Sequence, residues 1–366
     1  MKAVVLVGGE GTRLRPLTVT TPKPLLPIAG RPLVERQLVW LAAHGIDEVV
    51  LSLGYLPDAF VEHFPGDRFA SMALTYAVEP EPLGTAGAVR FAAEHVGIDE
   101  RFVVCNGDVL TTLDLGALVD FHVERGATAT IHLSQVEDPS ALGVVPTYPD
   151  GEVEAFIEKP APGTAPTNWI NAGTYVLEPD VLARIPPALA TSIERETFPR
   201  LLEDRGCVYA LGTGDYWLDV GTPEKYLEAH ADVLAGRMGS PPVLDAREEA
   251  PGVWLQGDVD LAAEASLEAP VLIGDGVAVA AGARVAGSAL GPGASVGPNA
   301  VVDHSVLLSG ARLARGALVR ASILGVGALV EEDAAVLDFS IVGAGACVPA
   351  STTLTGGRVP VAASAG

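Results

Sequence analysis

The sequence predicts an α/β domain with a Rossmann-like, mostly parallel sheet and flanking helices, followed by a left-handed parallel β-helix. Two observations predict this fold class. Over the first 230 or so residues, short apolar runs alternate with amphipathic helical segments. Beyond about residue 253, aliphatic residues recur every six positions with small residues between them. That period fits neither an α-helix nor a hairpin sheet, but it fits a solenoid with three short faces per coil.

The first part contains four predicted buried strands, at residues 3–7, 48–52, 74–78 and 102–106. The predicted helices cover about residues 32–44, 86–95, 115–125 and 223–234. Thr222 is the expected N-cap of the last helix and Pro223 its first residue. In such sheets ligands bind beyond the carboxyl ends of the strands, so the loops that follow these strands are the candidate site.

The repeat defines the second part. Its register slips by one residue at Leu290 and again after Leu308. The residues expected to point into the solenoid are Leu255, Leu261, Leu267, Ile273, Val279, Val285, Leu290, Val296, Val302, Leu308, Leu313, Val319, Leu324, Val330, Val336, Val342, Val348 and Leu354. We therefore divide the chain into a catalytic domain (1–235), a linker rich in Gly, Pro and acids (236–252), the β-helix (253–355) and a flexible tail (356–366).

Composition narrows the function. The formal net charge of −23 over 366 residues argues against a nucleic acid or an anionic membrane as partner. No apolar run is long enough to cross a bilayer, and the short apolar start is too brief for a signal peptide. Three widely spaced cysteines form no metal or disulfide pattern. We expect a cytoplasmic protein that binds small molecules.

The first strand leads into a glycine loop, GGEGTRLRPLTVTTPKPLLPIAGRPL, at residues 8–33. It is neither a dinucleotide fingerprint nor a Walker loop, because Leu14 replaces the third glycine and no Gly-Lys-Ser/Thr follows. Glycines let backbone N–H groups approach phosphate oxygens, and an arginine can bind phosphate through its planar fork. In an acidic protein, the cations gathered here indicate a small anionic ligand.

This string closely resembles the signature of the sugar-1-phosphate nucleotidyltransferases, Gly-Gly-x-Gly-Thr-Arg-Leu-x-Pro-Leu-Thr followed by Pro-Lys-Pro. The resemblance implies transfer of a nucleotidyl group from a nucleoside triphosphate to a sugar 1-phosphate, with release of pyrophosphate. It assigns Arg13 and Lys23 to the triphosphate. The other residues that it implies for nucleotide binding are Leu6, Gly8, Gly9, Gly11, Thr12, Glu79, Gly84, Thr85 and Gly107.

Further motifs extend the resemblance. Asp108 lies in Asn-Gly-Asp at the end of a buried strand, and Asp219 is the last residue of Tyr-Trp-Leu-Asp. In the family, acids at these two positions bind Mg²⁺. This ion is commonly held by one or two carboxylates together with phosphate oxygens. Glu158-Lys159-Pro160 matches the motif in which the lysine contacts the sugar phosphate and the glutamate the sugar hydroxyls. Gly143 and Asn171 lie in two more matching segments that imply sugar contacts. The catalytic residues so implied are Arg13, Lys23 and Lys159.

The loop at 79–87 and the segment at 192–199 most resemble mannose-1-phosphate guanylyltransferases that carry a C-terminal β-helix. They imply GTP and mannose 1-phosphate as substrates. We expect the β-helix to have a structural, oligomerising or regulatory role, and the protein to be a homo-oligomer. Three alternatives remain open. They are a uridylyl- or thymidylyltransferase acting on glucose 1-phosphate, a non-catalytic regulatory subunit that binds nucleotide sugars, and an acyltransferase activity of the β-helix with His304 as base.

Overall fold

The computed structural model describes residues 1–203, 207–239, 243 and 245–362. By its internal contacts the chain forms two compact units. The first unit comprises Met1–Gly9 and Val34–Trp217, and the second comprises Glu10–Leu33 and Leu218–Gly366. This division differs from the predicted one at residue 235, because the glycine-loop segment after Gly9 groups with the C-terminal half of the chain.

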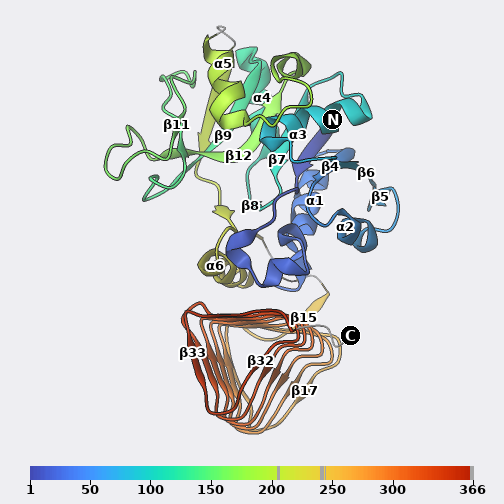
Figure 1. Ribbon diagram of the computed structural model, residues 1–366, viewed down its shortest axis with the longest axis vertical. Coiled ribbons are helices and arrows are strands. Elements are labelled where there is room, and N and C mark those ends of the chain that lie inside the picture. Colours follow the sequence, from blue (N-terminus) through green and yellow to red (C-terminus); the bar gives the residue numbers. More distant parts are fainter. Residues whose placement is uncertain (204–206, 240–242, 244, 363–366) are drawn as a thin grey trace. The chain divides into compact units, whose positions relative to one another are not determined.

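The first unit is built on one mixed sheet whose central strands β7, β1, β4 and β6 are parallel. The full order is β11-β10-β12-β7-β1-β4-β6-β5, with β9 between β12 and β13 (Figure 1). The strands of this unit are β1 (Lys2–Leu6), β4 (Glu48–Leu53), β5 (Arg68–Phe69), β6 (Met72–Val78), β7 (Phe102–Asn106), β8 (Val109–Thr111), β9 (Ala129–Gln135), β10 (Gly143–Val144), β11 (Ile157–Glu158), β12 (Trp169–Leu177) and β13 (Val208–Thr213).

Helices cover this sheet, as the alternating pattern predicted. They are α1 (Leu33–Ala43), α2 (Pro57–His63), α3 (Gly84–Val96), α4 (Leu115–Arg125) and α5 (Phe198–Glu203), with a 3₁₀ helix η4 (Pro179–Arg184) and a π-helix η5 (Ile193–Thr197). Helix α3 packs on β1, β4 and β6, while α4 packs on β9 and β13. Helix α4 begins where Asp114 accepts a hydrogen bond from Ala117 N, and it ends at Gly126, which has a positive φ.

The second unit opens with short elements that hold the signature segment: η1 (Thr12–Leu14), η2 (Leu17–Val19), η3 (Lys23–Leu25), and the hairpin strands β2 (Pro27–Ile28) and β3 (Arg31–Pro32). Strand β14 (Trp217–Asp219) leads into α6 (Pro223–Leu234). The predicted cap of this helix is confirmed, since the Thr222 side chain accepts a hydrogen bond from Lys225 N and Pro223 is the first helical residue.

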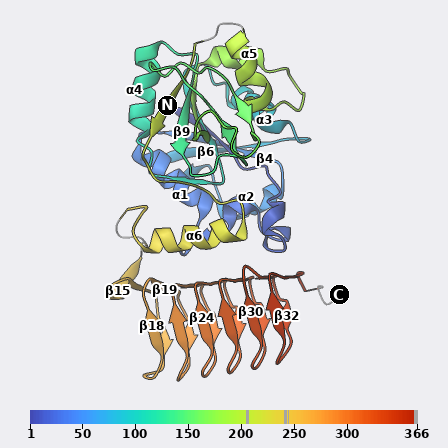
Figure 2. The same ribbon diagram turned by 90° about the vertical axis from the view of Figure 1, so that its left-hand side faces the viewer.

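The β-helix consists of three parallel sheets that form the sides of each coil (Figure 1) and stack coil upon coil (Figure 2). The first side contains β16 (Val253–Gln256), β19 (Val271–Ile273), β22 (Ala289–Leu290), β25 (Val306–Leu307), β28 (Ile323–Leu324), β31 (Ile341–Val342) and β34 (Arg358–Val359), with the antiparallel β15 (Ala246–Ala250) at its edge. The second contains β17 (Asp260–Leu261), β20 (Ala278–Val279), β23 (Ser295–Val296), β26 (Arg312–Leu313), β29 (Leu329–Val330) and β32 (Cys347–Val348). The third contains β18 (Ser266–Glu268), β21 (Arg284–Ala286), β24 (Val301–Asp303), β27 (Leu318–Arg320), β30 (Ala335–Leu337) and β33 (Thr353–Thr355).

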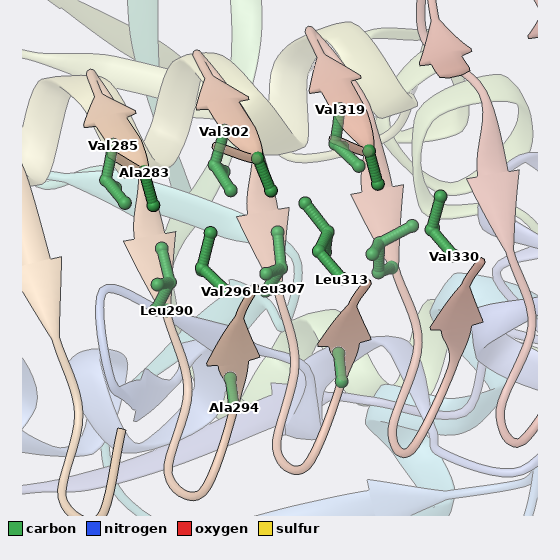
Figure 3. Packing of buried hydrophobic residues seen from close by; sticks show 14 of the residues in the cluster. Ala283, Val285, Leu290, Ala294, Val296, Val302, Leu307, Leu313, Val319 and Val330 are labelled. Atoms are coloured by element: carbon green, nitrogen blue, oxygen red, sulfur yellow. The ribbon is translucent and has the colours of Figure 1, made fainter. Parts of the chain in front are cut away.

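The predicted inward row forms the core of the β-helix with one correction. Leu307, not Leu308, belongs to the interior cluster, in which Figure 3 labels it together with Leu290. It pairs in register with Leu290 and Leu324. The strand β25 ends at Leu307, so Leu308 lies at the corner after it. The second slip in the six-residue repeat therefore falls between Val302 and Leu307, and not after Leu308.

Two boundaries also differ from the predicted ones. Strand β15 lies within the expected linker and pairs with β16, and β34 extends the β-helix into the expected tail. Residues 240–242, 244 and 363–366 of those two segments lie outside the described residues. In the described part of the chain, no helix has both the length and the apolar character that a membrane span requires.

Candidate active site

Four predicted nucleotide-binding residues lie at the carboxyl ends of the parallel strands in the first unit. Gly107 N donates to Leu6 O at 2.8 Å, and a Cβ placed on Gly107 would lie 2.6 Å from the same oxygen. A Cβ on Gly8 would lie 3.1 Å from Gly54 N and 3.5 Å from Glu79 Oε1. A side chain at position 107 would clash with the backbone, so glycine is required where β7 ends, whereas a Cβ at position 8 would be tightly packed.

Glu79 holds the loop that precedes α3. Its Oε1 accepts a hydrogen bond from Ser52 Oγ at 3.1 Å, and its Oε2 accepts one from Leu83 N at 3.0 Å. The loop continues into Gly84, whose φ is +67°, and a Cβ there would lie 2.7 Å from Thr191 O. Glu79 and Gly84, two of the predicted nucleotide-binding residues, therefore shape this loop.

Thr85 joins this loop to the segment 192–199. It lies in the first turn of α3 and not at its N-cap, which is Leu83. The Thr85 hydroxyl donates to Glu194 Oε2 at 2.9 Å and accepts from Ile193 N at 2.8 Å. Backbone bonds from Ala86 N and Thr191 N complete the connection. The two segments that sequence comparison singled out for substrate choice thus form one hydrogen-bonded structure.

The three predicted sugar-binding residues line a single cavity of about 220 Å³ in the first unit. Gly143 and Glu158 pair across β10 and β11, and Asn171 lies on β12. A Cβ on Gly143 would lie 3.1 Å from Glu158 Oε2. The other residues that line the cavity are Phe156, Ile157, Glu194, Arg195 and Pro199.

The segment at 192–199 also contributes Glu194 and Arg195 to the cavity, and neither residue was among the predicted site residues. Arg195 Nη2 donates to Glu158 Oε1 at 3.0 Å, and Ser192 Oγ donates to Glu194 Oε2 at 2.8 Å. The carboxylate of Glu158 is therefore oriented by an arginine, and the carboxylate of Glu194 by a hydroxyl group. Both residues lie in the π-helix η5, a kind of turn that is frequent at functional sites and that only the structure reveals.

Two other residues of β12, Gly173 and Tyr175, hold the side chain of the cavity residue Asn171. Asn171 Nδ2 donates to the hydroxyl oxygen of Tyr175 at 2.8 Å, and Asn171 Oδ1 accepts from Gly173 N at 3.0 Å. Burial raises the pKa of the Tyr175 hydroxyl well above its usual value, so this hydroxyl stays neutral. The amide of Asn171 is thereby held in one orientation.

Lys159 follows the cavity residue Glu158 in an unusual backbone conformation. Its φ is +49°, its N–H donates to Leu142 O at 3.1 Å, and its side chain is exposed. A non-glycine residue in the left-handed region costs conformational energy and is held by its surroundings, often at functional sites. The positive φ of Lys159 therefore makes it a candidate functional residue on structural grounds, apart from its motif.

The second unit holds the cationic residues of the signature. Lys23 is 7 % exposed, and its Nζ lies 3.7 Å from Asp219 Oδ1. Gly11 has a φ of +60°, and a Cβ there would lie 2.9 Å from Lys23 Cβ. A Cβ on Gly221 would lie 2.7 Å from Arg13 Nη2. Glycines on both sides thus let Arg13, Lys23 and Asp219 share one small region at the start of α6.

The structure gives fewer contacts for the remaining predicted residues, which are Thr12, Gly9 and Asp108. Thr12 begins η1, and a Cβ on Gly9 would meet open space. Asp108 follows Gly107 at the end of β7 in the first unit, whereas Asp219 belongs to the second. No cluster of three or more His, Cys, Asp or Glu side chains suited to a metal occurs among the described residues. The two acids therefore remain a predicted metal pair.

His304, the residue of the acyltransferase alternative, lies at a corner of the β-helix with its side chain 72 % exposed. Its Nδ1 lies 3.0 Å from Asp303 Oδ1, and its φ is +46°. It sits on the surface, in contact with its own coil and the neighbouring Gly287. These surroundings are those of a solvent-exposed residue at a corner of the β-helix.

Glycine loops at the ends of parallel strands and a segment that gathers Arg13 and Lys23 are suited to binding phosphate groups, as a nucleotidyltransferase requires. The chain belongs to the nucleotidyl transferase family, whose sequence pattern matches residues 2–236. Residues 261–338 match the GlmU-like C-terminal hexapeptide family. The predicted family, reaction class and hexapeptide β-helix are thereby confirmed.

Several proteins are similar to this chain. The mannose-1-phosphate guanylyltransferase of Mycobacterium tuberculosis is 44 % identical over 248 residues, which is 68 % of each chain. The mannose-1-phosphate guanylyltransferase 1 of Arabidopsis thaliana is 39 % identical over 287 residues, 76 % of each chain. The crystal structure of HddC from Yersinia pseudotuberculosis complexed with GMP-PN matches with a TM-score of 0.54 at 30 % identity, covering 63 % of this chain and 97 % of that one.

Proposed function

We propose that this chain is a mannose-1-phosphate guanylyltransferase, which converts GTP and mannose 1-phosphate into GDP-mannose and pyrophosphate. The observation that carries the proposal is the joined structure of the loop at 84–87 and the segment at 192–199, because these are the two segments typical of that specificity. The names of the similar Mycobacterium and Arabidopsis proteins support the same base and sugar.

The reaction needs no protein nucleophile. A phosphate monoester carries close to two negative charges at neutral pH, so an oxygen of mannose 1-phosphate attacks the α-phosphorus of GTP directly. The new O–P bond forms as the bond between the α-phosphorus and the bridging oxygen breaks, and that electron pair leaves on pyrophosphate. The barrier arises from bringing two anions together and from charge on the leaving group.

We assign the charged residues to two tasks, which are binding the anionic sugar phosphate and stabilising the charge on the leaving pyrophosphate. Lys159 binds the sugar phosphate beside the cavity that holds Glu158, Gly143 and Asn171, and so orients the attacking oxygen. Arg13 and Lys23 offset the charge that develops on pyrophosphate. Retention of all three cations together with both acids supports a catalytic protein over a regulatory nucleotide-sugar-binding subunit.

Asp108 and Asp219 are the residues that would hold Mg²⁺. The donor chemistry fits, since hard carboxylate oxygens suit this ion, and Asp219 lies beside Lys23, in the segment assigned to the triphosphate. Bound there, Mg²⁺ would offset phosphate charge and polarise the α-phosphate. The homo-oligomeric state and the cytoplasmic location stay predictions.

A substrate screen tests the proposal. Purified protein is mixed with each of GTP, UTP, dTTP and ATP and each of mannose, glucose, galactose and glucosamine 1-phosphates, and pyrophosphate release is measured. We expect the highest kcat/KM for GTP with mannose 1-phosphate. A higher value for UTP or dTTP with glucose 1-phosphate would support the alternative specificity. Absence of turnover with every pair would support the regulatory alternative.

A further inference from the structure

We infer that Tyr226 and His230 of α6 are positioning residues for the triphosphate-binding lysine, Lys23. They act through the hairpin of β2 and β3, which follows Lys23 in the chain. The inference rests on the proposed role of Lys23 in binding the triphosphate. Tyr226, His230 and the hairpin all belong to the second unit.

The hairpin has a turn that its sequence does not favour. Ile28 pairs with Arg31, so Ala29 and Gly30 form a two-residue turn, with φ values of +44° and +79°. Positive φ at both positions suits Asn-Gly or Gly-Gly. Glycine meets this requirement at position 30, but alanine is an uncommon residue at position 29. Contacts from elsewhere must therefore hold the turn in this conformation.

Two buried side chains supply those contacts. The Tyr226 hydroxyl donates to Pro27 O at 2.6 Å, and His230 Nε2 lies 3.0 Å from the same oxygen. His230 Nδ1 accepts a hydrogen bond from Ala29 N at 3.1 Å. Tyr226 is fully buried, His230 is 4 % exposed, and their rings meet with centroids 4.8 Å apart.

These partners fix the state of the imidazole. The backbone N–H of Ala29 can only donate and the carbonyl oxygen of Pro27 can only accept. His230 must therefore be neutral, with its proton on Nε2 and its lone pair on Nδ1. One ring bridges a donor and an acceptor of the same turn, which is what locks Ala29 in its left-handed conformation.

The connection from the turn to Lys23 is short. Leu26 N donates to Lys23 O at 3.1 Å, and Leu33 N donates to Leu26 O at 3.1 Å, which closes the base of the hairpin. Lys23 itself is almost buried and lies 3.7 Å from Asp219 through its ammonium group. Movement of Pro27 therefore displaces Lys23, whose position was assigned to the triphosphate.

The first two coils of the β-helix also approach this turn, at Gly30. A Cβ on Gly30 would lie 3.1 Å from Gln256 Oε1 on β16 and 3.4 Å from Leu272 Cδ2 on β19. Helix α6 contacts the turn at Ala29, and these coils approach it at Gly30. This gives the β-helix a structural connection to the lysine of the signature segment.

The test compares Tyr226→Phe, His230→Leu and His230→Gln in the full chain. Tyr226→Phe removes one hydrogen bond, and His230→Leu removes two, while the amide of glutamine can supply one donor and one acceptor. Loss of one buried hydrogen bond is worth about 1 kcal/mol, or about fivefold. We expect KM for the triphosphate to rise about fivefold in Tyr226→Phe and more in His230→Leu, with partial rescue in His230→Gln. KM for the sugar phosphate should stay unchanged.

A matched control and a direct readout complete the design. Lys225→Ala removes an exposed ion pair with Glu228 on the same helix and should change neither KM. Amide hydrogen exchange should show Ala29 N–H protected in the wild type and exposed in His230→Leu. Lower thermal stability with both KM values unchanged, or equal effects of the leucine and glutamine variants, would overturn the inference.

The measurements use whichever substrate pair the wild-type protein turns over best, and binding of GTP and of pyrophosphate is also measured by calorimetry. A different base or sugar preference would therefore refute the proposed specificity and leave this inference standing. Faster Ala29 exchange in His230→Leu with unaltered binding of both GTP and pyrophosphate would refute the inference and leave the specificity standing.

Discussion

The hydroxyl of Thr85 donates a hydrogen bond to Glu194 Oε2 at 2.9 Å, across 109 residues of sequence. Thr85 is one of the predicted nucleotide-binding residues, and Glu194 lines the cavity that contains the predicted sugar-binding residues. The same hydroxyl accepts a hydrogen bond from Ile193 N. The two halves of the proposed substrate site therefore share one side-chain contact, and binding at one half can depend on the other.

Removal of this contact should affect both substrates. Thr85→Val keeps the shape but cannot hydrogen-bond Glu194, so we expect KM for the nucleoside triphosphate and KM for the sugar phosphate each to rise about fivefold, equivalent to about 1 kcal/mol. Glu194→Leu, which leaves no acceptor for the Thr85 hydroxyl, should do the same, and the double variant should be no worse than the poorer single variant. Thr164→Val, which removes an exposed bond to Ala161 O, is the control. Additive effects of the two substitutions would show that the residues act separately.

Lys159 should act on the sugar phosphate. Lys159→Met deletes a positive charge that, at about 4 Å and an effective dielectric constant of 20, is worth on the order of 4 kcal/mol. This sets an upper expectation of roughly a thousandfold loss in kcat/KM, reduced by the exposure of the side chain. Titration calorimetry should show GTP binding little changed. Lys225→Met is the matched surface control. Weaker GTP binding with normal affinity for sugar phosphate would reassign Lys159 to the triphosphate.

The two acids should be needed for Mg²⁺-dependent turnover. Asp108→Asn and Asp219→Asn each remove a negative charge while keeping the side-chain shape, so we expect each to lose most activity and to remain folded by circular dichroism. The Mg²⁺ concentration at half-maximal rate should rise in both. Asp219→Asn also removes the ion pair between Lys23 Nζ and Asp219 Oδ1. A variant with full activity at the wild-type Mg²⁺ requirement would exclude that acid as a metal ligand.

A buried histidine makes the first unit less stable in acid. His132 is fully buried, with Nε2 at 2.9 Å from Thr213 Oγ1, and burial lowers its pKa to about 4. The unfolded chain, with a histidine pKa near 6.5, binds the proton first, so stability falls as pH drops from about 6.5 towards 4. Urea unfolding at pH 7 and pH 5 should differ by about 2 kcal/mol from this residue.

The histidine variants isolate that contribution. His132→Gln should flatten the fall in stability between pH 7 and pH 5, whereas His304→Gln, at an exposed corner, should leave it unchanged. Equal pH dependence in the wild type and in His132→Gln would contradict a neutral, buried His132.

The sequence allowed most elements to be predicted, because their signals are local. The strand at 102–106 and the helices at 115–125 and 223–234 have the predicted bounds, since apolar runs and caps such as Thr222 mark their ends. The inward row of the β-helix followed from its six-residue period. The error at Leu308 arose because both Leu307 and Leu308 are aliphatic, and only pairing with Leu290 and Leu324 selects Leu307.

What could not be predicted depends on contacts between distant residues. The bond from Thr85 to Glu194 and the bonds from Tyr226 and His230 to the hairpin join segments separated by 100 residues or more. The grouping of Glu10–Leu33 with the C-terminal half likewise has no signal in its own sequence. The motif identified Lys23, but the side chains that hold its segment lie in an ordinary amphipathic helix.

The most direct test of the proposed function is a competition in one vessel. Equal concentrations of GTP, UTP, dTTP and ATP are supplied with mannose 1-phosphate and Mg²⁺, and the nucleotide sugars formed at early times are separated and identified by mass. We predict that GDP-mannose is the main product and that its formation matches pyrophosphate release one for one. UDP- or dTDP-mannose as the main product, or no nucleotide sugar at all, would contradict the assignment of this chain as a mannose-1-phosphate guanylyltransferase.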